Sequence, residues 1–363
     1  MKVRLGDICT ITGGYAFDSH KMTQKGDYQI IKMGNLYNGI FDLSRNSSFI
    51  NAPTKKELEY LIQENDILIT LTGTTNKKDY GYTVQMEQPK NLLLNQRCAL
   101  IRASKVNEKY LFYLLNSNDF LKQFYASSTG GTGNQTNVSI NDMLDFKVYI
   151  SNENDQSKIS NILNALDKKI LTQIKIIDRL YSQIKYIKGQ ILNMTTITET
   201  KPLGQLCNIS TGKRDANEMK SNGSYKFFTC SKDDYCIDTY SFDGEALIIS
   251  GNGELGLIKY YNGKFDAYQR TYVLQNFKCH PKYLMYVLQN KLPKKIEKEK
   301  NVGAMPYIVL KTLTSINIDI LNMHDQIKIV NILNKFEEKL ENDRILLELF
   351  EKEKSFLLKN LFV

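Results

Sequence analysis

The sequence predicts two mixed α/β (α+β) domains in tandem repeat, separated by two long helices that pack against each other, with pseudo-twofold symmetry. Three observations lead to this fold class. The chain has 363 residues, a length that suits two or three domains. Four sequence blocks occur twice, in the same order. Each copy of the last block opens a long run whose apolar residues are spaced three or four apart.

The internal repeat defines two equivalent halves of the chain. The matched blocks are 5–12 with 203–210, 95–97 with 268–270, 109–116 with 282–289, and 155–164 with 325–334. The spacing between copies falls from 198 residues at the first pair to 170 at the last. Each half therefore holds a variable region followed by a fixed one, and the first variable region is the longer by roughly 28 residues.

The first domain is predicted over residues 1–151 as a mixture of strands and short helices. Residues 66–70 form an apolar strand that is closed by a glycine turn at Gly73, and residues 110–116 form a short helix. The domain ends in an alternating run that predicts a last strand, at Phe146, Val148 and Ile150.

The first long helix is predicted over residues 152–195. Some 38 residues with a rise of 1.5 Å each make a rod roughly 55–60 Å long. Because two such stripes occur in one chain, we expect the helices to pack against each other rather than each on its own domain. The predicted stripe runs through positions 159, 162, 166, 170, 174, 177, 180, 184, 187 and 191.

The second half repeats this order. A second domain is predicted over residues 196–321, with a strand at 245–250, a short helix at 283–289 and a last strand around Ile318. The second long helix, 322–363, is less regular because Arg344 and Lys354 interrupt its stripe. That stripe consists of Ile329, Ile332, Phe336, Leu340, Leu347, Phe350, Leu357 and Leu361.

Familiar catalytic motifs are missing from the sequence. No two prolines are adjacent, no proline precedes Asp, and no Gly-Lys pair precedes Ser or Thr. This excludes an Asn-Pro-Pro-Tyr methyltransferase motif, a Pro-Asp nuclease motif and a P-loop. Residues 251–256 fit G-x-G-x-x-G, but a strand-like run follows where a dinucleotide fold needs a helix, so we expect a loop between two strands. We predict no catalytic residue and no metal site.

Cysteine usage and hydropathy predict a cytoplasmic protein. The six cysteines lack the close pairs of structural zinc sites, so we expect reduced and mostly buried thiols. No apolar stretch follows the basic residues at the N-terminus, so no signal peptide is apparent. No run of eighteen apolar residues exists to span a membrane.

The formal net charge of +9 lies mostly on the two domains. They carry +3 and +4, whereas the helices carry +3 and −1. Basic residues cluster at 77–78, 213–214 and 291–300. A lysine cluster is most often only a solvated face. Here tyrosine, serine, asparagine and glutamine lie among the lysines, which is the mixture that contacts to phosphates and bases need.

The chain resembles the specificity (S) subunit of type I restriction-modification systems. The resemblance is carried by the two L-G-x-[IL]-C-x-I starts, the two Gln-Arg pairs and the twin D-Q-x-K-I-x-N-I-L-N helix openings. It covers the chain from Val3 to Phe362.

This resemblance implies that each variable region is a target recognition domain for half of a bipartite, asymmetric site in double-stranded DNA. It also implies that the two long helices pair as an antiparallel coiled coil, which sets a fixed non-specific gap. Two methyltransferase (M) subunits would dock on the chain, and restriction/translocase (R) subunits would join that methylase core. The chain would be non-catalytic and bind no cofactor. S-adenosylmethionine, ATP and Mg would belong to the partner subunits of an adenine methyltransferase and ATP-dependent endonuclease.

We expect base readers where the halves differ, because the two halves read different sequences. The recurrent Gln-Arg pairs favour a shared structural or phosphate role instead. The polar stretch 127–137 is either a second reading loop or a flexible connector. The predicted DNA contacts are Thr74, Thr75, Lys77, Lys78, Tyr80, Gln96, Arg97, Gln135, Asn137, Lys213, Arg214, Lys232, Asn252, Gln269 and Arg270.

The helix openings carry two further predictions. Asp155 and Asp325 are assigned to helix capping. Asn161 and Asn331 lie one turn in, where Asn does not favour a helix. They mark either the coiled-coil register or the methyltransferase contact.

Two other functions fit the same residues. One is a duplicated scaffold or interaction protein, and the other is the specificity chain of an unusual methylase-nuclease. The DNA sequence that is read, and the gap length, depend on loop geometry that the sequence does not give.

Overall fold

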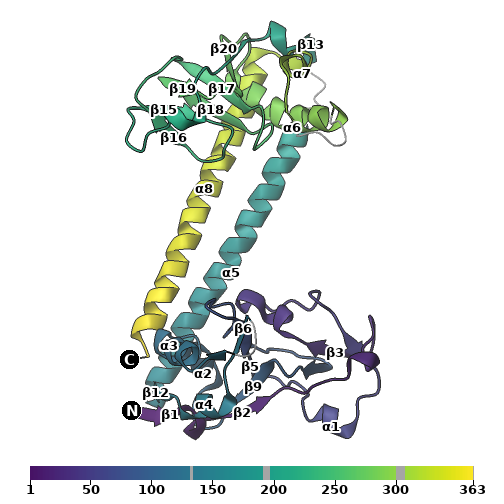
Figure 1. Ribbon diagram of the computed structural model, residues 1–363, viewed down its shortest axis with the longest axis vertical. Coiled ribbons are helices and arrows are strands. Elements are labelled where there is room, and N and C mark those ends of the chain that lie inside the picture. Colours follow the sequence, from purple (N-terminus) through teal and green to yellow (C-terminus); the bar gives the residue numbers. More distant parts are fainter. Residues whose placement is uncertain (131–133, 191–196, 300–306, 363) are drawn as a thin grey trace. The chain divides into compact units, whose positions relative to one another are not determined.

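The structure is a computed structural model that describes residues 1–130, 134–190, 197–299 and 307–362. It divides into two compact units. Unit 1 comprises residues 1–173 and 346–363, and unit 2 comprises residues 174–345. Each unit contains one of the mixed α/β domains and about half of each long helix (Figure 1). Position 191 of the predicted stripe, residues 131–133 of the polar stretch and Lys300 lie outside the described residues.

Unit 1 contains short strands and four short helices before its long helix begins. Its helices are α1 (Lys55–Leu58), α2 (Glu108–Leu114), α3 (Asn118–Ala126), α4 (Ile140–Asp145) and the start of α5 (Glu153–Gln190). Its strands are β1 (Lys2–Arg4), β2 (Cys9–Gly13), β3 (Tyr28–Ile31), β4 (Phe49–Ile50), β5 (Ile67–Thr70), β6 (Thr72–Thr74), β7 (Thr83–Gln85), β8 (Leu92–Leu94), β9 (Cys98–Ala103), β10 (Thr129–Gly130), β11 (Gln135–Asn137) and β12 (Lys147–Tyr149).

Unit 2 contains a similar series of elements. Its helices are α6 (Pro281–Glu299), α7 (Leu310–Thr314) and the first part of α8 (Met323–Asn360). Its strands are β13 (Ile197–Pro202), β14 (Asn208–Thr211), β15 (Tyr225–Phe228), β16 (Tyr235–Ile237), β17 (Glu245–Ser250), β18 (Ile258–Asn262), β19 (Phe265–Ala267), β20 (Thr271–Gln275) and β21 (Asn317–Leu321).

The two units share one sheet topology, which confirms the predicted tandem repeat. The main sheet has the order β2-β9-β5-β7 in unit 1 and β14-β20-β17-β18 in unit 2. A second sheet has the order β4-β3-β8 and β16-β15-β19, and in both units its last pair is parallel. The pairs β1-β12 and β13-β21 join the start of each domain to its end.

The units differ mainly around the helices. Among the residues that the structure describes, unit 1 has a helix α3 and a sheet of order β10-β11-β6 that have no separate counterparts in unit 2. In unit 2 the helix expected over 283–289 extends to Glu299 and contains Pro293. That extension is rich in lysine and glutamate, which are good helix formers, so the helix continues past the short recurrent block.

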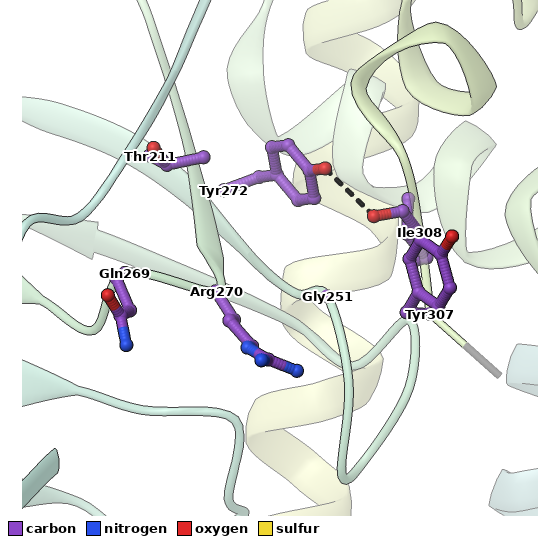
Figure 2. Close-up of a pocket in the computed structure, with 7 residues that line it drawn as sticks. All are labelled: Thr211, Gly251, Gln269, Arg270, Tyr272, Tyr307 and Ile308. Carbon is purple, nitrogen blue, oxygen red and sulfur yellow. Dashed lines mark hydrogen bonds between the residues drawn. The ribbon is translucent and has the colours of Figure 1, made fainter. Parts of the chain in front are cut away.

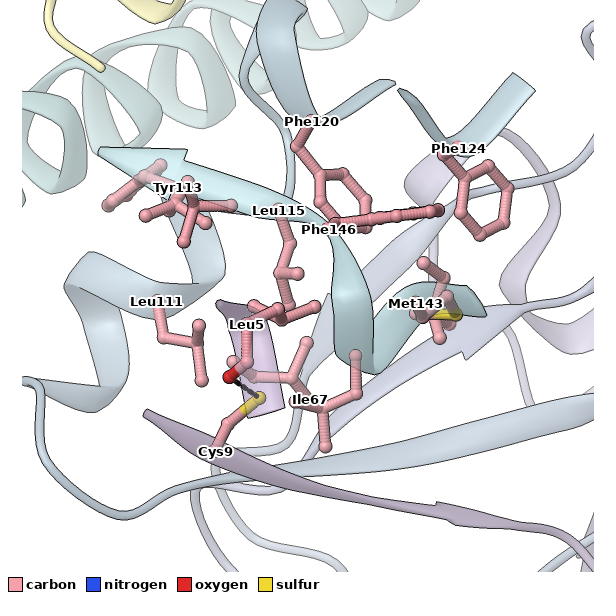
Figure 3. Packing of buried hydrophobic residues seen from close by; sticks show 14 of the residues in the cluster. Leu5, Cys9, Ile67, Leu111, Tyr113, Leu115, Phe120, Phe124, Met143 and Phe146 are labelled. Carbon is pink, nitrogen blue, oxygen red and sulfur yellow. Dashed lines mark hydrogen bonds between the residues drawn. The ribbon is translucent and has the colours of Figure 1, made fainter. Parts of the chain in front are cut away.

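The recurrent start of each half is a core element. Leu5 and Leu203 are fully buried, and the thiols of Cys9 and Cys207 lie 3.3 and 3.7 Å from the carbonyl oxygens of these two leucines. Figure 3 shows Leu5 and Cys9 packed with Ile67 and Leu111 in the core of unit 1. Burial raises the pKa of Cys9 and Cys207 to about 12, in agreement with the predicted buried thiols.

The two long helices are present, and their buried faces follow most of the predicted stripe, including Ile159, Leu166, Ile177, Leu180, Ile184, Ile329 and Leu340. Ile162, Ile174 and Ile332 were expected inside and are exposed. Leu163 and Leu333 are fully buried instead, and the matched positions 173 and 343 place buried polar side chains, Gln173 and Asp343, in the helices. Adjacent Ile and Leu residues satisfy a spacing of three or four equally well, so spacing alone did not decide which of the two faces the protein.

The helices are packed together through equivalent contacts in each unit. In unit 1 the carboxylate of Asp167 on α5 accepts from the hydroxyl of Tyr113 on α2 at 2.9 Å and pairs with Lys354 on α8 at 2.6 Å. In unit 2 Glu337 on α8 accepts from Tyr286 on α6 at 2.9 Å and pairs with Lys188 on α5 at 2.9 Å. The first part of each helix thus packs against the last part of the other, which makes the pair antiparallel.

A buried glutamine near the start of each long helix forms hydrogen bonds with the adjoining domain. The amide of Gln156 accepts from the backbone N–H of Asn107 and donates to the carbonyl of Ser151, at 3.1 and 2.9 Å. The amide of Gln326 makes the same two bonds, to His280 and Leu321, at 2.8 and 2.7 Å. The D-Q-x-K-I motif therefore marks the joint between helix and domain.

The helix caps differ in detail from the prediction. Asn152 and Asn322 are the residues that immediately precede the helices, and each side chain accepts from the backbone N–H of Asp155 or Asp325 at 2.9 Å. Each aspartate accepts in return from the side-chain amide of that asparagine. The aspartates thus take part in capping from inside the first turn.

Among the described residues, no helix combines the length and apolar character needed to cross a bilayer.

Candidate nucleic-acid interface

The two recurrent Gln-Arg pairs occupy the same place in both units. Gln96 and Arg97 lie in the turn before β9, and Gln269 and Arg270 lie in the turn before β20. All four side chains are exposed. The backbone carbonyl of Arg97 accepts from Leu71 and that of Arg270 from Gly251, both at 3.0 Å. Neither guanidinium has a hydrogen bond or ion pair with any residue that the structure describes, so both are available to an outside anion.

In unit 2 this turn borders a pocket of about 390 Å³. Figure 2 shows the side chains of Gln269, Arg270 and Tyr307 around it, while the hydroxyl of Tyr272 donates to the carbonyl of Ile308 at 2.8 Å. The lining residues are Thr211, Gly251, Gln269, Arg270, Tyr272, Tyr307 and Ile308.

The backbone passes so closely beneath this pocket that only glycine fits at position 251. A Cβ atom there would lie 2.4 Å from the carbonyl oxygen of Arg270. Residues 251–256 form the turn between the antiparallel strands β17 and β18, which confirms the predicted loop between two strands. The G-x-G-x-x-G pattern here serves the close approach of two backbone segments.

Three more of the predicted contacts of unit 2 lie close to this turn along the backbone. Lys213 precedes Arg214, whose carbonyl accepts from the backbone N–H of Gln269 at 3.0 Å. Asn252 follows Gly251 directly. Lys232 is exposed and lies 3.5 Å from Glu254. The sequence candidates of the second half are therefore neighbours in space.

Arg214 is a structural residue rather than an available cation. Its guanidinium donates to the fully buried carboxylate of Asp266 at 3.1 Å, to Glu218 at 3.2 Å and to Thr239 at 3.0 Å. The hydrogen bond to Asp266 is the main cause that raises the pKa of Arg214. Because its donors are occupied by the protein, we remove Arg214 from the set of proposed DNA contacts.

In unit 1 two candidate segments that are distant in sequence form one small sheet. Strand β11 pairs with β6, with Gln135 opposite Thr74 and Asn137 opposite Thr72. The hydroxyl of Thr72 donates to the side-chain oxygen of Asn137 at 3.1 Å. The polar stretch therefore contains strands β10 and β11, and β11 lies beside the predicted contact Thr74. Gln135 and Asn137 are both exposed on this sheet.

Thr74 and Thr75 form hydrogen bonds that fix the backbone of this region. The carboxylate of Asp79 accepts from the backbone N–H and the hydroxyl of Thr74 at 2.8 and 2.7 Å, and these bonds lower the pKa of Asp79. The backbone N–H of Thr75 donates to Asn134 at 2.9 Å, and its hydroxyl oxygen is buried. Both residues shape the surface on which their neighbours lie.

The three remaining candidates of the first half have different environments. Lys77 is exposed and Lys78 lies over the ring of Tyr125, 5.3 Å from its centroid. Tyr80 was expected at the surface, but its ring is 3% exposed and packs against Phe124 and Tyr125 in the core. Helix α3, which supplies both partners, covers this ring, so Tyr80 is not among the contacts that we propose.

Sequence reasoning missed Tyr307, which is 68% exposed at the edge of the pocket in unit 2. It lies 170 residues after Asn137, the same spacing as in the last matched block. Extending that alignment backwards by 18 residues would have found it.

The two asparagines that were predicted to contact a partner lie on the solvent side of the long helices. Asn161 and Asn331 are exposed, and neither side chain has a partner in the part of the chain that is described. The adjacent Ile162 and Ile332 are 54% and 41% exposed.

With this geometry in place, comparison with known proteins is decisive. The sequence profile of the type I restriction modification DNA specificity domain matches residues 1–180 and 198–350. The chain belongs to this family. The type I restriction enzyme EcoDI specificity subunit of Escherichia coli is 35% identical to this specificity chain over 150 residues, which are 41% of this chain and 33% of that subunit. The chain thus matches about a third of the length of that relative.

Solved structures have the same fold. The crystal structure of a type I restriction-modification system S subunit from M. genitalium matches all of the specificity chain and 96% of its own, with a TM-score of 0.68 and 18% identity. A chain from a study of complex assembly and conformational transition of the type I R-M system matches 99% of this chain and 96% of its own, with a TM-score of 0.57 and 15% identity.

Proposed function

We propose that this specificity chain directs a type I restriction-modification complex to a bipartite, asymmetric site in double-stranded DNA. Unit 1 would read one half-site and unit 2 the other. The paired helices would keep a fixed, unread gap between them. The chain itself would carry out no chemistry. Partner methyltransferase subunits would bind S-adenosylmethionine, and restriction subunits would use ATP and Mg.

One observation carries the proposal: the same exposed Gln-Arg turn occurs in both units, beside side chains that differ. Arg97 and Arg270 have no partner among the described residues, and arginine is well suited to phosphate and base edges. A turn that both units keep fits a contact to the common DNA backbone. The neighbouring residues that differ fit the reading of two different sequences.

The proposed DNA surface combines this turn with the other candidates whose side chains are wholly or partly exposed. In unit 1 it includes Lys77, Lys78, Gln135 and Asn137, and Thr74 and Thr75 support their backbone. In unit 2 it includes Lys213, Lys232 and Asn252. Both sets are polar and basic, which suits the phosphates of DNA.

Docking of two methyltransferase subunits is supported by exposed apolar side chains that recur with the spacing of 170 residues. Ile162 matches Ile332, Ile176 matches Leu346, and Tyr186 matches Phe356. The last two are 67% and 66% exposed. Each unit thus presents an equivalent set, one from the beginning of one helix and two from the end of the other. Equivalent exposed apolar sets suit two copies of one protein partner.

Coexpression tests the proposal. The chain is produced with a methyltransferase subunit, the complex is purified, and methylated adenines in the host DNA are mapped by sequencing. We expect a complex with two methyltransferase subunits and a bipartite methylated motif. A chain from which residues 197–321 are replaced by a flexible linker should lose the second half-motif. A methyltransferase that copurifies but leaves no motif would favour the scaffold alternative.

A further inference from the structure

Positions 137 and 307 are structurally equivalent in the two units. The backbone N–H of Val138 donates to the carbonyl of Leu71 at 3.1 Å, and that of Ile308 donates to Gly251 at 2.9 Å. Leu71 and Gly251 in turn donate to the carbonyls of Arg97 and Arg270. Val138 and Ile308 are both buried, so each anchors the residue before it beside the Gln-Arg turn.

The side chains at these two positions differ in chemistry. Position 137 is an asparagine, and position 307 is a tyrosine that lines the pocket with Gln269 and Arg270 (Figure 2). Both side chains are exposed at the surface. The neighbouring turn keeps Gln and Arg in both units. One position therefore varies beside a constant pair.

Asn137 and Tyr307 each carry groups that can contact a base. In unit 1 the side-chain oxygen of Asn137 accepts from Thr72, while its amide nitrogen has no partner among the described residues and can donate to a ligand. An amide donor suits the acceptors on the edge of a purine. In unit 2 the ring of Tyr307 offers an apolar face for a thymine methyl group and a hydroxyl for a base edge.

We propose that residues 137 and 307 are specificity-determining positions, each reading a base of its own half-site, while Arg97 and Arg270 hold the adjacent phosphates. This inference rests on the proposed function and deepens it. It assigns selectivity to the two side chains that differ and affinity to the pair that recurs. The two roles have different signatures, because phosphate contacts act equally on all sequences and base contacts do not.

The test uses the complete complex with its methyltransferase subunits and duplexes that carry single base-pair changes in the wild-type motif. Competition binding measures the preference at each position. Asn137→Ala should lower discrimination about five- to a hundred-fold at one position of the first half-site only. Tyr307→Ala should do the same at one position of the second half-site only. Asn137→Asp retains the shape and the bond from Thr72 but removes the amide donor, so it should also change that one preference.

Arg97→Ala and Arg270→Ala should weaken binding to every duplex alike and reduce the slope of log affinity against log salt by about one. Tyr149→Ala, at an exposed ring on β12, is the control and should leave both measures unchanged.

Full discrimination in both Asn137→Ala and Tyr307→Ala would overturn the inference, as would a single-position loss in an arginine variant. The outcomes distinguish a wrong function from wrong residue roles. If the wild-type complex makes no bipartite motif, the proposed function is wrong. If it makes one and the variants at 137 and 307 retain it unchanged, only the inference is wrong.

Discussion

The buried amide of Gln326 joins three segments of unit 2. It accepts from the N–H of His280 at the start of α6 and donates to the carbonyl of Leu321 at the end of β21. Gln326 itself lies near the start of α8, which is the third segment, and is 2% exposed. An unmet buried polar group costs about 1–3 kcal/mol.

We therefore expect Gln326→Ala to lower the free energy of unfolding of unit 2 by roughly 2–4 kcal/mol, since it removes the glutamine's hydrogen bonds to one buried and one partly buried backbone group. Urea unfolding followed by circular dichroism measures this. Asn331→Ala, at an exposed position of the same helix, should change it by less than about 0.5 kcal/mol. Equal stability of the two variants would show that Gln326 is not a fastening residue.

For single residues, the sequence predicts the environment of some candidates and not of others. Exposed and unpaired Arg97 and Arg270 could be identified from their recurrence. Tyr80 and Arg214 could not, because the ring that covers one and the carboxylate that binds the other lie 44 and 52 residues away in sequence. A lysine- or arginine-rich segment does not reveal which of its side chains form hydrogen bonds or ion pairs within the folded protein.

At the scale of elements, helices α2 and α6 contact the long helices through tyrosine hydroxyls. Tyr286 donates to Glu337, and Lys188 lies both on that carboxylate and over the tyrosine ring, 4.6 Å from its centroid. Burial, together with the charge of Glu337, raises the pKa of Tyr286. In unit 1 burial and Asp167 raise the pKa of Tyr113.

This arrangement predicts loss of stability in alkali. A tyrosine in the unfolded chain titrates near pH 10, whereas the folded protein holds the proton to higher pH. The stabilisation is complete below about pH 10 and is lost as the pH rises above it. We expect Tyr286→Phe to cost about 1–2 kcal/mol at neutral pH, because the charged Glu337 loses a donor. The variant should also lose less stability than the wild type between pH 10 and 11.

Urea unfolding at a series of pH values checks this, with Tyr149→Phe, at an exposed ring, as the control. The same alkaline slope in Tyr286→Phe and wild type would contradict the assignment.

Element boundaries and element faces were predictable to different degrees. The two long helices and the last strand of each half follow from spacing and alternation. Most of the buried face of each helix follows from spacing as well, but the choice at positions 162 and 163 does not, because Ile162 and Leu163 are both apolar and only one of them faces the protein. Gln156 settles the choice: Ser160 and Leu163 lie one and two turns further on the same face, and all three are buried. The pairing of β6 with β11 links residues some 60 apart, which no local pattern contains.

At the scale of the whole molecule, the repeat predicts two partner sites of equal kind. Ile162→Asp and Ile332→Asp each place a charge in one of the exposed apolar sets. We expect each variant to weaken binding at one of the two proposed methyltransferase sites by about tenfold or more. The apolar side chain that would be buried on binding is replaced by a charged one. The double variant should weaken both.

Native mass spectrometry of the purified complex counts the subunits: two for the wild type, one for each single variant and none for the double variant at limiting concentration. Ile40→Asp, at an exposed apolar residue away from the long helices, is the matched control. Two subunits bound to the double variant would place the docking surface elsewhere.

The central claim is that one chain reads two half-sites at a fixed separation. Its most direct test is to measure the affinity of the methyltransferase complex for duplexes that carry both half-sites with gaps lengthened or shortened one base pair at a time. We expect tight binding at one gap length and a loss of about a hundredfold or more on either side, because a change of gap leaves one half-site out of register with its unit. Equal affinity at every gap length would contradict the claim.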